Sequence, residues 1–151
     1  MVIGCIASGV LCRLLKVGGT LVIGTVLTLC TWLYMLLNIH TLSVMDLKLS
    51  LSCLGFLQMV TISANFILIK ELAGNALLAS AMGLINGFTW ICGAGIFQQV
   101  WGIIINNVSK GVKPYPVEAF QIAMQVQVIT IIISVACALY LAKSLNKPTI
   151  N

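Results

Sequence analysis

Long uncharged apolar runs alternate with short charged segments along the chain. A helix that crosses a membrane needs about 20 largely apolar residues. Four runs meet that length, at about 17–39, 49–69, 77–105 and 119–142. The apolar segment 1–12 is too short to span and predicts the second half of a helix. No run shows the sustained alternation of a transmembrane β-strand. We therefore predict an all-α polytopic membrane helical bundle, one domain over 1–151, with four full transmembrane helices and a partial N-terminal helix.

The composition supports a membrane protein. The chain has 151 residues, of which 60% are hydrophobic and 7% charged, whereas soluble domains contain about 25% charged residues. The formal net charge is +5, but the cations form no basic stripe interleaved with aromatic residues, so we expect no nucleic-acid partner. The lipid bilayer is the expected environment.

The charged segments predict the orientation in the membrane. If the predicted helices alternate in direction, one side carries five cations: Arg13, Lys16, Lys70, Lys143 and Lys147. The other side carries three, beside two carboxylates: Lys48, Lys110, Lys113, Asp46 and Glu118. The positive-inside rule then places the turns at 13–16 and 70–76 and the C-terminus in the cytoplasm.

Catalytic and metal-binding patterns are absent from the sequence. The six cysteines form no CxxC pair and lie in or beside apolar segments, where small buried hydrophobes are common. His40 is the single histidine and has no neighbouring nucleophile or carboxylate, and the three acidic residues fall in predicted turns. We therefore predict no enzyme activity, no cofactor and no metal.

A polar face runs along the second predicted helix. Gln58, Thr61 and Asn65 are spaced i, i+3 and i+7, which places them on one side of a helix. Polar groups at membrane depth face protein or water. These three residues therefore either form interhelical hydrogen bonds, each contributing about 0.6 kcal/mol, or line an aqueous substrate pathway.

The third predicted helix is rich in small residues. Ala79, Gly83 and Gly87 repeat every fourth position, a spacing that lets another helix approach closely in lipid. Small and polar residues continue beside and beyond this strip: Asn86, Thr89, Gly93, Gly95, Gln98 and Gly102. We predict helix packing, and bending at the glycines during a conformational cycle is a further possibility.

The segment "LIKELAGNALLASAMGLINGFTWICGAGIFQQVWGIII" resembles a stretch of major facilitator superfamily transporters. The similar stretch is the link between the tenth and eleventh helices together with the eleventh helix, in a bacterial branch of that family. The matching residues are Lys70, Glu71, Ala81, Gly83, Asn86, Gly93, Ala94, Gln98 and Gly102. Gly9 matches the glycine of the family's cytoplasmic glycine-aspartate-basic motif, whereas Arg13 stands at its usual aspartate position.

The resemblance implies the C-terminal third of a twelve-helix carrier that works by alternating access. Segment 1–12 would end the eighth helix, and the four spans would be helices nine to twelve. The tenth helix of this family faces the central cavity, which favours Gln58, Thr61 and Asn65 as contacts for a small solute. The eleventh packs between the two halves. The chain would then be a truncated or split carrier of the bacterial cytoplasmic membrane, inactive without the N-terminal helices as its partner.

Two other functions remain open. A non-transporting four-helix interaction or assembly protein would use the Ala79–Gly83–Gly87 strip for contact with a partner. A small multidrug-type dimeric carrier is disfavoured, because such carriers depend on a carboxylate inside a span and the spans here contain none.

Overall fold

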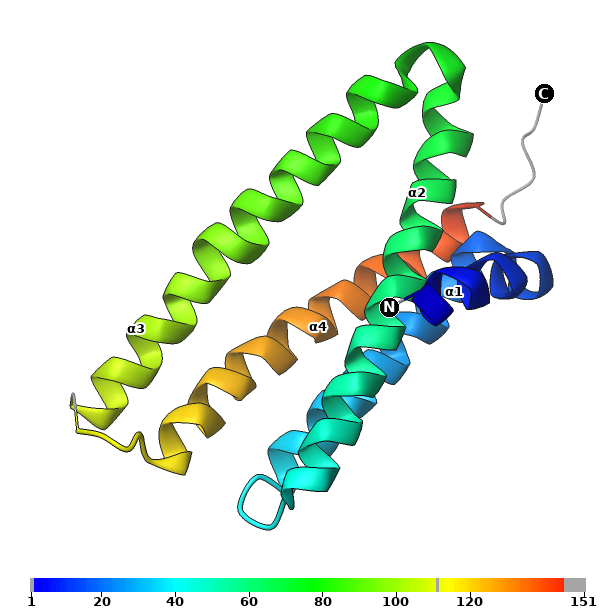
Figure 1. The fold of residues 1–151 in the computed structure, drawn as a ribbon. Coiled ribbons are helices and arrows are strands. Elements are labelled where there is room, and N and C mark those ends of the chain that lie inside the picture. The colour runs from blue at the N-terminus through cyan, green and yellow to red at the C-terminus, as the bar shows by residue number, and fades with distance from the viewer. Residues whose placement is uncertain (1, 111, 146–151) are drawn as a thin grey trace. The chain divides into compact units, whose positions relative to one another are not determined.

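The computed structural model describes residues 2–110 and 112–145, and these are almost entirely helical (Figure 1). The elements are α1 (Val2–Leu37), α2 (Val44–Thr89), the π-helix η1 (Trp90–Phe97), α3 (Gln98–Ser109) and α4 (Val117–Leu145). No strand occurs in these ranges. The predicted all-helical membrane fold is confirmed at this level.

The number of spanning helices differs from the prediction. Within the described ranges, three continuous helices are long and apolar enough to cross a membrane: Val2–Leu37, Val44–Ser109 and Val117–Leu145. Four full helices and a partial one were expected. The difference arises because the chain does not leave the helix for several residues at 13–16 and 70–76. It departs from helical geometry at single residues, Lys16 and Gly74.

The two interruptions differ in their chemistry. Lys16 has φ 58° and ψ 166°, and Gly74 has φ 64° and ψ 176°. Glycine adopts positive φ readily, but a residue with a Cβ is strained there by about 1–3 kcal/mol. Surrounding contacts must therefore hold Lys16. Its carbonyl accepts a hydrogen bond of 3.0 Å from the Thr20 hydroxyl, and the following residues Val17 and Gly18 are buried.

The chain forms two compact units, which are described separately. Unit 1 contains the described parts of Met1–Leu68 and Val128–Asn151, and unit 2 is Ile69–Gln127. In unit 1 the two segments of α1 pack on α2 in opposite directions. Gly4 and Ser8 contact α2 near Phe56 and Val60, so the first segment runs parallel to α2.

The second segment of α1 runs antiparallel to α2 (Figure 1). Gly24 contacts Thr61, and Thr31 lies 3.9 Å from the sulfur of Cys53. The buried cluster of unit 1 lies at the other end of this segment and consists of Val17, Leu21, Ala64 and Leu68, with Cys12, Ile67 and Leu141 packed against it. The interruption at Lys16 thus lets one helix contact α2 twice.

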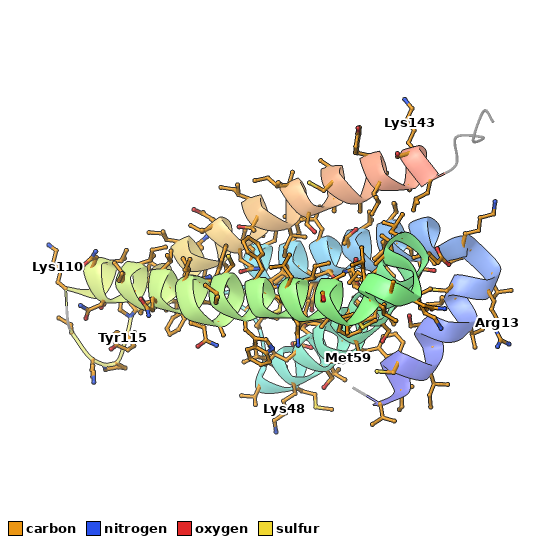
Figure 2. The ribbon with its side chains drawn as sticks, turned by 90° about the horizontal axis from the view of Figure 1, so that it is seen from above. Arg13, Lys48, Met59, Lys110, Tyr115 and Lys143 are labelled. Atoms are coloured by element: carbon orange, nitrogen blue, oxygen red, sulfur yellow. The ribbon has the colours of Figure 1, made fainter. Side chains whose placement is uncertain are left out.

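Local sequence explains where α2 begins and α3 ends. Ser43 and Asp46 form a reciprocal cap at the start of α2, in which the Ser43 hydroxyl donates to Asp46 Oδ2 (2.7 Å) and the Asp46 amide donates to Ser43 Oγ (3.1 Å). α3 ends at Lys110, which adopts the left-handed conformation. Lys110 and Tyr115 lie at the same connection (Figure 2), where the Tyr115 ring meets Phe120 edge to face.

Candidate functional site

The predicted substrate face on α2 is divided between two environments. Gln58 and Asn65 are exposed. Thr61 is half-buried, and a methyl group placed on Gly24 would lie 2.7 Å from its Oγ1. The Thr61 hydroxyl donates a 2.9 Å hydrogen bond to the Leu57 carbonyl of its own helix. Thr61 therefore contacts α1, while the two amides lie beside that contact.

The neighbouring face of α2 is apolar and covered. Its buried side chains recur every three or four residues: Leu54, Leu57, Val60, Ala64 and Leu68. This spacing produces a continuous stripe, and α1 packs on it. Gln58 and Asn65 lie at the edge of that stripe. Each offers hydrogen-bond donors and acceptors without charge, so a polar, uncharged partner suits them in an apolar setting.

The small residues of unit 2 are open in this structure. All eight predicted packing or gating residues are exposed: Ala79, Gly83, Asn86, Gly87, Gly93, Gly95, Gln98 and Gly102. A methyl group placed on Gly83, Gly87, Gly93 or Gly102 would meet nothing within 4 Å. On Gly95 it would approach only the Trp90 carbonyl, at 3.8 Å. The face has the composition of a helix contact, and the described residues of unit 2 leave its glycines open.

The π-helix η1 was not predicted from the sequence. It spans Trp90–Phe97 and contains Gly93 and Gly95. Hydrogen bonds in a π-helix join residues five apart, and such segments are frequent at functional sites. A sequence signal exists in the run Gly93-Ala94-Gly95, whose small side chains offer little resistance to the wider turn. Because η1 divides the helix, the small residues before and after it do not follow one regular α-helical stripe.

The close contacts of unit 1 were also missed. A methyl group on Gly4 would lie 2.7 Å from the Phe56 carbonyl oxygen and 2.8 Å from Met59 Cβ; Figure 2 marks Met59 beside this region. One on Gly18 would lie 3.1 Å from Ala142 Cα. Glycines within the apolar runs were the sequence feature that could have indicated these contacts. The sequence does not show which of those glycines contact a neighbouring helix.

The Ser8 side chain forms a hydrogen bond between two helices of unit 1. The Ser8 hydroxyl is fully buried and donates to the Val60 carbonyl at 3.1 Å. Most of the threonine hydroxyls of the apolar helices instead donate to carbonyls three or four residues earlier, as Thr25 and Thr28 do. These hydroxyls are therefore satisfied within their own helix.

The ionisable side chains of the described residues form no metal-binding group, and one of them, Asp46, has a shifted pKa. Among the described residues, no group of three or more His, Cys, Asp or Glu could hold a metal ion. The pKa of Asp46 is lowered, first because its side chain accepts the Ser43 hydroxyl and then because it accepts the Ser43 amide. The Asp46 carboxylate lies outside the apolar segments. Its ionised form stabilises the N-terminal end of α2 through the hydrogen bonds with Ser43.

The chain matches no protein-family model, no curated protein and no solved structure. The resemblance of 70–102 to major facilitator superfamily transporters therefore stays a prediction from the sequence. The fold itself indicates an integral membrane protein with three long apolar helices. Any finer assignment belongs to the proposal that follows.

Proposed function

We propose that the chain contributes helices to a secondary transporter of the major facilitator type, which moves a small solute by alternating access. The observation that carries the proposal is the open small-residue face of unit 2. A helix with a GxxxG spacing and nothing within 4 Å of Gly83 or Gly87 is built to receive another helix. In the proposed carrier, helices of the other half would cover this face.

The proposal assigns four spans and a half-span to the three continuous helices. The interruption at Lys16 divides α1 into segments 2–15 and 17–37, and the one at Gly74 separates 44–73 from 75–109. Each of the longer segments, like Val117–Leu145, is long enough to cross a bilayer. Segment 2–15 contacts α2 at Phe56–Val60 through Gly4 and Ser8, and its Cys12 packs against the cluster that contains Leu68. Its length of about two-thirds of a spanning helix suits half a span.

Solute contacts in this proposal come from α2. Gln58 and Asn65 are exposed amides in the uncharged run 49–69 of α2, and polar groups at membrane depth face water or protein. We place both on the aqueous pathway, with Thr61 supporting the adjacent contact with α1. The cation distribution favours a cytoplasmic C-terminus, and the family likeness favours the bacterial cytoplasmic membrane.

Aqueous access to Gln58 and Asn65 tests the pathway. In a variant whose six cysteines are replaced by alanine, Gln58→Cys and Asn65→Cys are compared with Phe66→Cys, an exposed apolar position on the same helix. Intact membranes from cells that normally contain the chain are treated with a charged, membrane-impermeant maleimide, because thiols in lipid react poorly. We expect modification of the first two variants and protection of the third. Equal modification of all three, or of none, would contradict the pathway.

A non-transporting assembly protein is the second candidate, because the same open face could bind a partner helix without any solute pathway. The two functions differ in the labelling result and in association. An assembly protein would form a discrete oligomer through 79–87 with Gln58 and Asn65 inaccessible to the maleimide. The small multidrug-type dimer has less support, since Asp46, Glu71 and Glu118 all lie outside the predicted apolar runs.

A further inference from the structure

Three cations lie toward one end of unit 1, named here the cationic end: Arg13, Lys16 and Lys143. The close approach of Gly18 to Ala142 places the start of the second α1 segment, which follows Lys16, beside the end of α4, which carries Lys143. All three side chains are exposed. Figure 2 shows Arg13 and Lys143 extending outward from the structure.

Among the described residues of unit 1, no carboxylate side chain lies at this end. The sequence of unit 1 contains one acidic residue, Asp46, which caps α2 at the opposite end, near Lys48. Lys70 and Glu71, which follow unit 1 in the sequence, offset each other in charge. The described part of unit 1 therefore carries three cations without a carboxylate partner toward one end, and the Asp46 and Lys48 pair at the other.

Exposed apolar side chains lie among these cations. Leu14 and Leu15, between Arg13 and Lys16, are 74% and 39% exposed, and Leu145, two residues after Lys143, is 39% exposed. Val17, which follows Lys16 in the sequence, and Leu21 belong to the buried cluster of unit 1. Long cationic side chains above an apolar surface can place their stems along hydrocarbon and their charged groups among lipid headgroups. A soluble anion would gain nothing from the leucines.

We propose that the cationic end binds the headgroup phosphates of anionic phospholipids, with the acyl chains against Leu14, Leu15 and Leu145. This inference requires that unit 1 lies in a membrane and does not depend on transport. Each cation near an anionic surface strengthens attraction by up to about fivefold. The three together therefore predict a clear preference for anionic over zwitterionic lipid, and added salt should weaken that preference.

Lipid retention by the purified full chain tests the inference. The chain is equilibrated with equal amounts of dioleoyl phosphatidylglycerol and dioleoyl phosphatidylcholine in mixed micelles, and bound lipids are counted by native mass spectrometry. The test variant is Arg13→Gln/Lys16→Gly/Lys143→Gln. Glycine is chosen at position 16 because it accepts the positive φ there. We expect the variant to lose the phosphatidylglycerol preference by at least tenfold, and the control Lys48→Gln to keep it.

Three results would overturn the inference: an unchanged preference in the test variant, an equal loss in Lys48→Gln, or full displacement of the bound lipid by millimolar inorganic phosphate. Circular dichroism checks that the helix content is retained. If the triple variant does not fold, Arg13→Gln/Lys143→Gln leaves the interruption at Lys16 intact. That variant should lose the preference by about tenfold, and the same three results apply to it.

Discussion

Three glycines of unit 1 and two glycines of unit 2 occupy opposite environments. In unit 1, Gly4, Gly18 and Gly24 are buried, and an added methyl group would come within 2.7–3.1 Å of a neighbouring helix. In unit 2, Gly83 and Gly87 have nothing within 4 Å. The residue type and the apolar surroundings are the same. The comparison teaches that a small residue in a membrane helix permits a close contact, and that a facing helix must then be present to use it.

Hydroxyl groups extend the comparison. In unit 1 the Ser8 hydroxyl donates to a carbonyl of another helix, that of Val60. In unit 2 the exposed Thr89 hydroxyl donates to the Ile85 carbonyl of its own helix at 2.8 Å. Unit 1 thus uses both its glycines and a polar side chain to join helices. Unit 2 leaves the corresponding groups directed to its own helix or to its surroundings.

The largest expected effect comes from a bulky residue at the contact between α1 and α4. Gly18→Leu places an isobutyl group against Ala142, whose Cα would lie 3.1 Å from the new Cβ, and should lower the free energy of unfolding by about 3 kcal/mol. Gly87→Leu, its control in unit 2, meets open space and should change it by less than about 1 kcal/mol. Unfolding by dodecyl sulfate in micelles, followed by circular dichroism, measures both. Equal losses would remove the distinction between the units.

A smaller change tests the contact between α1 and α2. Gly4→Ala would bring a methyl group to 2.7 Å from the backbone oxygen of Phe56, and backbone cannot move aside as a side chain can. We expect a loss of about 1–2 kcal/mol. Gly9→Ala lies on the same segment with nothing within 4 Å, and it should be neutral or slightly stabilising, because alanine favours helix. The same unfolding titration decides, and a stabilised Gly4→Ala variant would be inconsistent with close packing there.

The interhelical hydrogen bond should have a weaker effect. Ser8→Ala removes the donor to Val60 and should reduce stability by about 0.6 kcal/mol. Ser52→Ala is the control, because the exposed Ser52 hydroxyl donates to the Lys48 carbonyl within one helix. The difference between the two variants isolates the bond between helices. If the control loses as much as Ser8→Ala, the hydroxyl acts through local helix geometry and not through contact between helices.

The smallest effect concerns acid. The pKa of Asp46 is lowered in the folded chain by its bonds to Ser43, so the ionised cap stabilises the folded state above the ordinary pKa of 3.8. That stabilisation is lost as the pH falls below 3.8, through the lower folded value. Asp46→Asn should flatten this part of the pH dependence in unfolding titrations between pH 5 and pH 2. The difference in the free energy of unfolding between Gly18→Leu and Gly87→Leu should not depend on pH in this range. A change in that difference with pH would show that helix packing and the Asp46 cap are coupled.

Several elements could be read from the sequence because short-range chemistry fixes them. The apolar run 119–142 predicted most of the helix Val117–Leu145. Apolar runs long enough to cross a bilayer predicted a helical membrane protein. The turns expected at 13–16 and 70–76 contain the interruptions at Lys16 and Gly74. Hydropathy could not show that each interruption is a single residue, because one non-helical residue leaves the apolar pattern almost unchanged.

The candidate residues were predictable in type but not in environment. Gln58, Thr61 and Asn65 share a helical face, as their spacing predicted, yet Thr61 is half-buried against Gly24 of α1 whereas Gln58 and Asn65 are exposed. That difference depends on which side of α2 the first helix packs. The π-helix η1 was likewise invisible, because the choice between hydrogen bonds four and five residues apart involves small energies spread over Trp90–Phe97.

The sequence by itself determined that this chain is helical, apolar and asymmetric in charge, since hydropathy and charge act locally along the chain. Only the tertiary structure decided which small residues are in contact, where α1 changes direction and that the start of its second segment lies beside the end of α4. The physical reason is that van der Waals packing depends on facing surfaces. Glycine leaves space in every helix, and the neighbouring helix decides whether that space is filled.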